Sequence, residues 1–451
     1  MKTRPQTPRT LLAATLGVTA FLGFAPIAAA AAAPAKPYQI LTTTQVPAAG
    51  GIDYVTADSV NRRVYVSNGN VVSVFDLDTY KLVGTLPNAS GHGVAIDPEN
   101  HTGLVSGNPA TFINTQTLQP IKTIPAPGAD GYIFDAPTHH FFILSHGAPN
   151  LLVVDSKDGS VVGTVEAIGP DGTNAAVEQG ATDNQGHLYF DVANAHHVAV
   201  VDAKTLKVTG HFDLGDQGNG PSGLAIDAKN HILFVMCRGA AGGTPTCVVV
   251  SAIDGKILAT LPLAGSSDGG TFNPNTMEAF SSHGNGTLTV IKENSPTQFV
   301  VEETVQTKMG GKTLTLDAKA DHVIVIATEA APVLPGPTVP TAAQQAALAA
   351  LNTGVQPQQQ AANAARTALA AATFATPADV NQIRAKADAL AAAEAALAQA
   401  RAEAFGKLQA SNDKLSTQLT QMVVMSAGRG GQVQFGGGGG PQLLDVLFIG
   451  R

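Results

Sequence analysis

Residues 51–79 read GIDYVTADSVNRRVYVSNGNVVSVFDLDT, and variants of this pattern recur along the chain at intervals of about 40 residues. The recurring parts are a Gly-x-Ala-Ile-Asp type run, a polar turn, an apolar run and a Val-x-Val-Val-Asp type run. Later copies contain GVAIDP from Gly93, GYIFDAP from Gly131, HLYFDV from His187, GLAIDAKN from Gly223, TFNP from Thr271 and TLTLDAK from Thr313. The chain therefore holds seven copies of one unit.

Each copy predicts four short strands, which we call a to d in chain order. The Gly-x-Ala-Ile-Asp run is strand a, the apolar run is strand b, the Val-x-Val-Val-Asp run is strand c, and turns such as Asp158-Gly159 lead into strand d. One small sheet cannot cover both of its faces, so neighbouring copies must supply the cover. We predict an all-β fold, a seven-bladed β-propeller of four-stranded antiparallel blades. Two stacked β-sandwiches fit the fixed period poorly.

The seventh copy of the repeat is incomplete in the sequence around residues 313–327. Its strands a and b fall near 313–317 and 322–327, and no strand c follows them directly. The apolar run LLDVLFIG, residues 443–450, fits strand c, and the run YQILTTT, residues 38–44, has no partner in its own copy. We expect residues 38–44 to form strand d of the seventh blade, because pairing both ends closes the ring and removes exposed sheet edges. The propeller would then comprise 38–335 and 441–451.

The repeats resemble those of exported bacterial propellers with YVTN repeats, a seven-bladed family. The nearest match to that motif is Val64-Tyr65-Val66-Ser67-Asn68, and NHILFV from Asn230 and VLFIGR from Val446 are similar. The resemblance covers about 38–330 and 441–451. It implies a propeller fold and export, but no particular activity. Some members are thought to bind nucleic acid.

An Ala-rich segment, residues 341–425, interrupts the last blade. Ile383, Leu390, Leu397 and Leu408, with alanines between them, form an apolar stripe at helical spacing. Thr376-Pro377-Ala378-Asp379 fits the start of that helix, with Thr376 as N-cap. Further helices are expected over about 358–372, 342–353 and 413–424. We predict a helical hairpin or small bundle that either binds a partner or is a tolerated insertion. A Gly-rich linker, 426–440, follows it.

The first 33 residues have the pattern of a cleaved signal peptide. Lys2, Arg4 and Arg9 precede an apolar stretch from Leu11 to Ile27, and an alanine run ends the segment. We expect a periplasmic or secreted protein with no membrane span after cleavage. Cleavage leaves 23 Lys and Arg against 34 Asp and Glu, a net charge of −11. Nucleic acid is therefore not a favoured partner.

Candidate functional residues lie where each strand a begins. In a propeller these positions converge on one mouth of the central channel, which the b–c connections share. The strand-a positions are Asp53, His92, Asp130, Glu178, Ser222, Asp268 and Thr313, and the b–c connections add His146, Arg238 and His283, with His196 and His197 nearby. We expect a ligand-binding site formed by Asp53, His92, Asp130, Glu178, Asp268 and His283. It could hold a divalent cation, a cationic ligand or ordered water. The alternative is that these are ordinary turn residues.

A pair of cysteines and a pair of histidines are further candidates for a chemical role. Cys237 and Cys247 flank one b–c loop, so a cross-hairpin disulfide is possible, the alternative being one buried thiol and one thiol in the loop. His139 and His140 are expected in an a–b turn on the opposite face, as surface residues and not as metal ligands.

Two functions remain open at this point. The first is an exported binding or scaffold protein that recognises an unidentified protein partner or small ligand at the channel mouth, with no cofactor required. The second is a metal-dependent, lactonase-like hydrolase, in which a channel cation polarises a carbonyl and activates water. The absence of catalytic motifs in the sequence favours the first function over the second.

Overall fold

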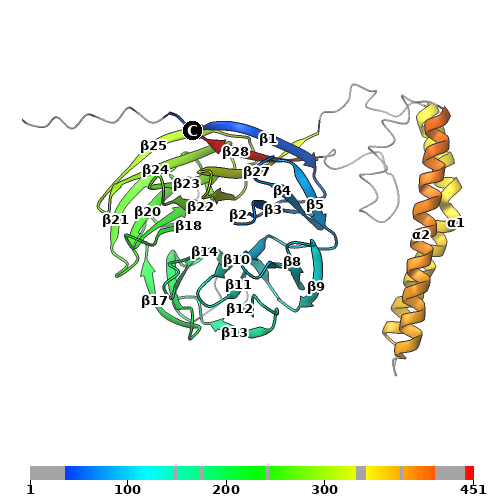
Figure 1. The fold of residues 1–451 in the computed structure, drawn as a ribbon, viewed down its shortest axis with the longest axis horizontal. Helices are drawn as coiled ribbons and strands as arrows, with labels where there is room; N and C mark the ends of the chain where they lie inside the picture. The colour runs from blue at the N-terminus through cyan, green and yellow to red at the C-terminus, as the bar shows by residue number, and fades with distance from the viewer. Residues whose placement is uncertain are drawn as a thin grey trace, which may run out of the picture. The chain divides into compact units, whose positions relative to one another are not determined.

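The computed structural model describes residues 36–146, 150–172, 176–239, 243–331, 342–375, 379–411 and 442–451. In these ranges the strands form seven four-stranded antiparallel sheets, and Figure 1 shows the sheets arranged around a common axis. The prediction of a seven-bladed β-propeller is confirmed. The expected signal peptide, the helix expected over 413–424 and the Gly-rich linker lie outside the described residues.

The first six blades each use four consecutive strands. Blade 1 comprises β2 (Val55–Asp58), β3 (Arg63–Asn68), β4 (Val71–Asp76) and β5 (Leu82–Leu86). Blade 2 comprises β6 (Val94–Asp97), β7 (Thr102–Val105), β8 (Ala110–Asn114) and β9 (Gln119–Ile124). Blade 3 comprises β10 (Ala129–Asp135), β11 (His140–Ser145), β12 (Asn150–Asp155) and β13 (Val161–Glu166).

The next three blades repeat this order. Blade 4 comprises β14 (Val177–Thr182), β15 (His187–Val192), β16 (His197–Asp202) and β17 (Lys207–Asp213). Blade 5 comprises β18 (Pro221–Asp227), β19 (Ile232–Cys237), β20 (Thr246–Ser251) and β21 (Ile257–Pro262). Blade 6 comprises β22 (Ser267–Asn273), β23 (Glu278–His283), β24 (Thr287–Ser295) and β25 (Gln298–Gln306).

Blade 7 joins the two ends of the propeller. It comprises β26 (Leu314–Asp317), β27 (His322–Ala330), β28 (Gln442–Gly450) and β1 (Gln39–Pro47). The register pairs Ile40 with Ile449 and Thr44 with Val446. The strand with no partner in its own copy is therefore the outer strand of the last blade, as the sequence predicts, and the ring closes by hydrogen bonds between segments about 400 residues apart in the chain.

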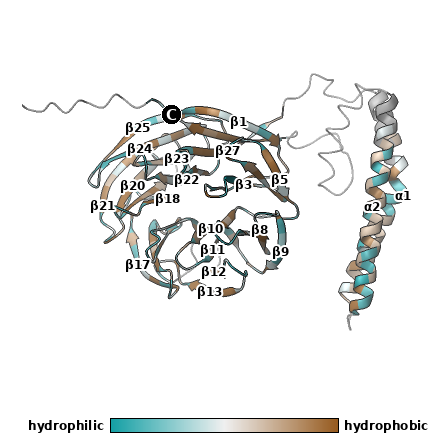
Figure 2. Cartoon of the chain, in the orientation of Figure 1, coloured by the Kyte–Doolittle hydropathy of each residue, from teal (hydrophilic) through white to brown (hydrophobic). Residues whose placement is uncertain are grey.

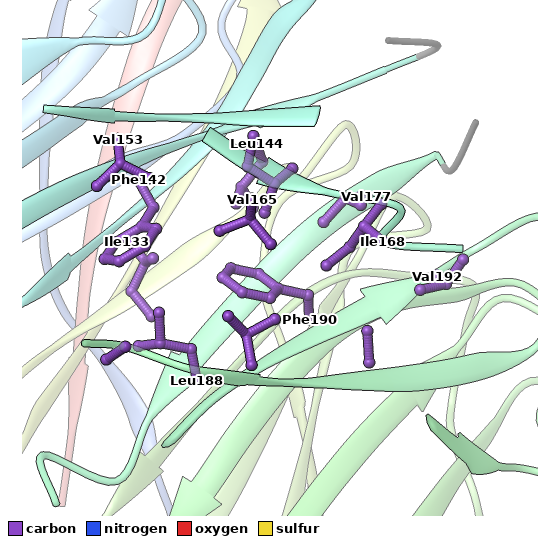
Figure 3. Packing of buried hydrophobic residues seen from close by; sticks show 14 residues of the cluster. Ile133, Phe142, Leu144, Val153, Val165, Ile168, Val177, Leu188, Phe190 and Val192 are labelled. Carbon is purple, nitrogen blue, oxygen red and sulfur yellow. The ribbon is translucent and has the colours of Figure 1, made fainter. Parts of the chain in front are cut away.

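Hydrophobic cores lie between neighbouring blades. Figure 3 shows one of them, in which Ile133 and Phe142 of blade 3 pack with Leu188 and Phe190 of blade 4. The core at the closure joins Phe75 of blade 1 to residues of blade 7. Figure 2 shows hydrophobic residues running along strands such as β27. Because burying one large apolar side chain stabilises a fold by about 1.5–3 kcal/mol, each blade depends on its neighbours.

The a–b turns explain the repeated Asp at the end of strand a. In blade 2, Asp97 Oδ1 accepts hydrogen bonds from the backbone N–H groups of Glu99 and Asn100, and Asp97 Oδ2 accepts one from Asn100 Nδ2 at 2.7 Å. Asp58 with Asn61, and Asp227 with Asn230, form the same turn. Asp and Asn favour such turns because their side chains bond to nearby backbone.

Two helices follow β27 in the chain and precede β28. They are α1 (Ala342–Thr373) and α2 (Val380–Ser411), and Val355, Ala362 and Leu397 form a buried contact between them. The helices expected over 342–353 and 358–372 are one continuous helix that contains Pro357. The N-cap of α2 is Asp379, whose Oδ1 accepts from the N–H groups of Asn381 and Gln382. Thr376, the expected cap, lies outside the described residues, and neither helix has the length and hydrophobicity that a membrane span needs.

Candidate functional site

The channel mouth carries a polar side chain from every blade. Five of these residues lie within two positions of the start of a strand a, as expected: Asp53, His92, Asp130, Glu178 and Asp268. Two lie at the b–c connections, His146 after β11 and Arg238 after β19. Lys312, which precedes β26, completes the set. In an antiparallel blade the start of strand a lies beside the end of strand b, so all eight side chains share one face.

These eight residues form a closed ring of alternating acids and bases, which we call the charge ring. His92 Nδ1 lies 2.7 Å from Asp53 Oδ2 and 3.2 Å from Asp130 Oδ1. His146 bridges Asp130 and Glu178, with Nδ1 and Nε2 each 3.2 Å from a carboxylate oxygen.

The other half of the charge ring uses the two permanent cations. The Arg238 guanidinium donates to Glu178 at 2.9 Å and to Asp268 at 3.3 Å. Lys312 Nζ lies 3.3 Å from Asp268 Oδ2 and 3.5 Å from Asp53 Oδ1, and so returns the network to its first member. Each acid therefore contacts two bases, and each base contacts two acids.

The bases face solvent more than the acids do. The side chains of His92, His146, Arg238 and Lys312 are 38–46% exposed, and the four carboxylates are 10–29% exposed. The structure interleaves the expected acids with bases that are more exposed to solvent. The sequence places His92, His146 and Arg238 at this mouth, and Lys312 is the one base of the charge ring that was not expected there.

The charge ring shifts the pKa values of its members. Burial alone would raise the pKa of Glu178, but hydrogen bonds from His146 and Arg238 outweigh it and lower the pKa to about 2. Burial raises the pKa of Asp130 above its ordinary value. The hydrogen bond to Asp53 raises the pKa of His92, and the one to Glu178 raises the pKa of His146. Both imidazoles therefore hold a proton more readily than a free histidine does.

Contacts below the charge ring cross the channel. The Tyr54 hydroxyl of blade 1 donates to the backbone carbonyl of Glu178 in blade 4 at 2.7 Å. The Gln179 side chain donates to the Gly270 carbonyl at 2.8 Å and accepts from the N–H groups of Leu224 and Gly270. The chain also comes very close at Gly223, where a Cβ would lie 2.7 Å from backbone of Gly269. These contacts hold the starts of the strands a in fixed relative positions.

Asp191 supports the charge ring from beneath. It is fully buried, and its Oδ1 accepts from the N–H groups of Glu178 at 2.9 Å and Gln179 at 2.8 Å. Burial raises its pKa to about 7. Nothing in the sequence distinguishes Asp191 from an ordinary residue of strand b. Lys312 was not expected either, although it precedes the expected position Thr313 by one residue.

Three residues that were expected at the channel mouth, Ser222, Thr313 and His283, are not members of the charge ring. The hydroxyl groups of Ser222 and Thr313 donate to backbone carbonyls of the next blade, those of Ser267 and Asp53. His283 is fully buried beside Thr287, and burial lowers its pKa to about 4. His283 therefore makes none of the ion pairs that link the charge ring.

The remaining histidines also lie apart from the charge ring. His197 Nδ1 contacts the carbonyl oxygen of Ala195, and His196 precedes strand β16. His139, in the a–b turn of blade 3, has its Nδ1 3.3 Å from Asp97 Oδ2 of blade 2. His140 is half-buried, and burial lowers its pKa.

The expectation of a disulfide is wrong. Cys237 and Cys247 are both buried free thiols. Strand pairing sets Cys247 opposite Met236, so Cys247 shares its face of the blade with Met236, and Cys237 points to the other face. The two thiols accordingly belong to different hydrophobic clusters. Burial raises the pKa of Cys237 to about 12, so neither the position nor the chemistry favours oxidation.

Two groups of side chains at the charge ring have the donors for a metal ion. Asp53, His92 and Asp130 form one group, and Asp130, His146 and Glu178 form the other. In each group the donor atoms lie within 4.8 Å of one another. These are the two such groups found among the described residues.

Comparison with known sequences finds distant relatives. No family model matches the chain. Two curated relatives are the uncharacterized proteins YncE of Salmonella typhi and Salmonella typhimurium, each 26% identical over 197 residues, which is 41% of this chain and 53% of the relative. The chain thus spans about half the length of the curated relatives it matches.

Solved structures resemble the chain through the fold alone. A chain of a mitotic checkpoint complex has a TM-score of 0.55 at 14% identity, over 69% of this chain and 96% of its own. The WD40 repeats of RRP9 have a TM-score of 0.52 at 12% identity, over 64% and 89%. Kuenenia stuttgartiensis hydrazine synthase has a TM-score of 0.50 at 13% identity, over 61% and 92%. The fold class that these structures share with the chain is that of a β-propeller.

Proposed function

We propose that this propeller is a binding protein that takes a small ligand at the charge ring. The observation that carries the proposal is the ring itself, because seven blades each place a polar side chain at one mouth. A few polar groups that converge on a rigid scaffold are a usual feature of ligand sites. The blades supply the rigidity through the contacts of Tyr54 and Gln179 across the channel.

We further propose that the ligand carries an anionic group. The exposed members of the charge ring are its bases, and two of them keep unused donors. A lysine ammonium has three N–H donors, and Lys312 directs two of them at Asp268 and Asp53. A guanidinium has five, and Arg238 uses three, on Glu178, Asp268 and the Ser267 carbonyl. A carboxylate or phosphate above the mouth could accept the spare donors.

A small ligand fits this site better than a polyanion does. The chain carries a net charge of −8, so a long nucleic acid would be repelled by the molecule as a whole. A single anionic group would meet only the local bases. We also propose, from the pattern of the first 33 residues and the YVTN-like repeats, that the protein acts after export.

Ring-dependent ligand binding can be measured by thermal shift. Wild-type protein and the variants Arg238→Gln and Lys312→Gln are screened, with chelator present, against mono- and dicarboxylates and phosphate monoesters. We expect one compound class to raise the Tm of the wild type and to lose at least tenfold in affinity in both variants. Arg366→Gln is the matched control, because Arg366 pairs with Glu394 on the helices at 2.9 Å. If nothing in the panel stabilises the wild type, or if all four proteins respond alike, the proposal is wrong.

Metal-dependent hydrolysis is the second candidate. The two groups of metal donors at the charge ring favour it, because a cation there could polarise a carbonyl and lower the pKa of a bound water. The test is hydrolysis of simple lactones with and without added Zn²⁺. Turnover that requires the metal and disappears in Asp130→Asn would support hydrolysis, and no turnover in either condition would contradict it.

A further inference from the structure

We propose that Asp53, His92 and Asp130 bind one divalent transition-metal ion, with Zn²⁺ as the best fit, and that this ion forms part of the ligand site. The proposal rests on the function proposed above and names one component of that site. Its three residues come from three adjacent blades: Asp53 and His92 each lie two residues before a strand a, and Asp130 lies within β10.

The distances suit a tetrahedral metal. His92 Nδ1 lies 2.7 Å from Asp53 Oδ2 and 3.2 Å from Asp130 Oδ1. Ligand atoms bound to zinc at about 2.0–2.1 Å are separated by about 3.3 Å in a regular tetrahedron. The separation of His92 from Asp130 is already close to this value, and that of His92 from Asp53 would have to widen by about 0.6 Å to admit the ion.

The donor types select among metals. One imidazole nitrogen and two carboxylate oxygens are common zinc ligands. Calcium takes six to eight oxygen ligands, which this group does not offer. A single nitrogen between two carboxylates holds either a proton or a metal ion at that point, so binding of the ion displaces a proton from the imidazole.

The second oxygen of each carboxylate is already held by a base. Lys312 Nζ lies 3.5 Å from Asp53 Oδ1, and His146 Nδ1 lies 3.2 Å from Asp130 Oδ2. In metal sites such outer partners orient the ligands and contribute 10–100-fold in affinity. The oxygens that face His92 are Asp53 Oδ2 and Asp130 Oδ1, and these are the ones left for the ion.

The backbone that carries the ligands is fixed in the same way in two blades. The N–H of Asp53 donates to Ser67 Oγ at 3.0 Å, and the N–H of Gly93, next to His92, donates to Ser106 Oγ at 3.0 Å. Each serine belongs to the neighbouring strand b or follows it directly. The imidazole is about half exposed, so three protein ligands leave one position open toward solvent for a water or for the anionic group of the ligand.

The second group of donors, Asp130, His146 and Glu178, is less suitable for a metal ion. Glu178 Oε1 faces His146 Nε2, but the same oxygen accepts a hydrogen bond from Arg238 at 2.9 Å. A metal ion there would lie directly beside a guanidinium, which repels it. The Asp53 oxygen that faces His92 has no such cation, because Lys312 contacts the other oxygen.

Titration of the full chain with ZnCl₂ by calorimetry, after chelator treatment, tests the proposal. We expect one equivalent to bind the wild type, and at least tenfold weaker binding to Asp53→Asn, His92→Gln and Asp130→Asn. His187→Gln is the matched control: His187 Nδ1 lies 2.8 Å from Asp183 Oδ2, so it is a His–Asp pair of the same length, but it is absent from both donor groups. Circular dichroism confirms that each variant is folded.

Co²⁺ gives a second readout that does not depend on heat of binding. Substituted for Zn²⁺, it should show the visible absorption of a four-coordinate site in the wild type and in His187→Gln, and not in His92→Gln. No zinc binding, or equal binding by His92→Gln and His187→Gln, overturns the metal site. If zinc does not bind, but an anion still binds in the presence of chelator and this binding depends on Arg238 and Lys312, the metal site is wrong and the proposed function stands. If neither zinc nor any anion of the panel binds, both proposals are wrong.

Discussion

Individual acidic residues of this propeller have different environments and different roles. Asp97 is fully buried, but it accepts hydrogen bonds from Asn100 and from the Ser156 hydroxyl of the next blade, and these outweigh burial and lower its pKa. Glu293 is also buried; it accepts a hydrogen bond from Asn230 Nδ2 at 2.9 Å, and its other neighbour is the carboxyl group of Asp227. Burial raises the pKa of Glu293 to about 7, so ionising it costs free energy.

The variant Glu293→Gln is expected to gain stability at high pH. Between pH 4.5, the ordinary pKa of a glutamate, and about 7, the folded state holds a proton that the unfolded state has lost. Folding stability of the wild type therefore falls as pH rises through this window. Gln has the shape of the protonated acid, so we expect the variant to be more stable by about 2 kcal/mol at pH 8 and nearly equal at pH 5.

Urea unfolding of wild type and Glu293→Gln at both pH values measures the effect. Glu166→Gln, at an exposed position, serves as the control and should show no difference between the two conditions. An equal gain at pH 5 and pH 8 would contradict the assignment of the raised pKa to Glu293.

At the scale of elements, the two helices have a small core of their own. Val355, Ala362 and Leu397 are its buried members, with alanines packed around them, and Arg366 pairs with Glu394 across the two helices. The cluster contains helix residues alone among the described residues. Most other side chains of the helices are exposed.

Removal of residues 341–435 is expected to leave the propeller folded. The deletion keeps β27 and β28, whose pairing runs from Ala330 with Gln442 to Val323 with Ile449. We expect the Tm of the β-rich transition to change by only a few degrees, while circular dichroism loses its helical signal. A collapse of that transition would show that the helices belong to the fold of the propeller.

At the scale of the whole molecule, stability depends on closure of the ring. Blade 7 takes strands from both ends of the described chain, and its core residues Ile326, Val446 and Phe448 pack with Val64 and Phe75 of blade 1. A propeller that opened at this blade would expose two sheet edges and this hydrophobic core to water.

Phe448→Ala is expected to destabilise the whole propeller by about 3–5 kcal/mol, because it leaves a cavity in the closure core. Phe374→Ala is the matched control, since Phe374 is 84% exposed and its loss should change stability by less than about 0.5 kcal/mol. Denaturant unfolding measures both. A similar, small effect of the two substitutions would show that blade 7 does not hold the ring together.

The repeat pattern was sufficient to predict the number of blades, their four strands and the pairing of 38–44 with 443–450. These properties depend on local alternation, turn residues and the absence of a strand c in the seventh copy, all of which can be read along the chain. The location of Asp53, Asp130 and Asp268 at one channel mouth could also be predicted, because each lies close to the start of a strand a.

What surrounds those acids was decided by the tertiary structure. Lys312 lies about 260 positions from Asp53 in the chain, yet the closed ring places its ammonium 3.5 Å from that carboxylate. The faces of Cys237 and Cys247 depend in the same way on strand register, which sets Cys247 opposite Met236. Charge pairing at the mouth is set by distances between blades, and the direction of the two cysteines by the register of strands within one blade; the spacing of residues along the chain specifies neither.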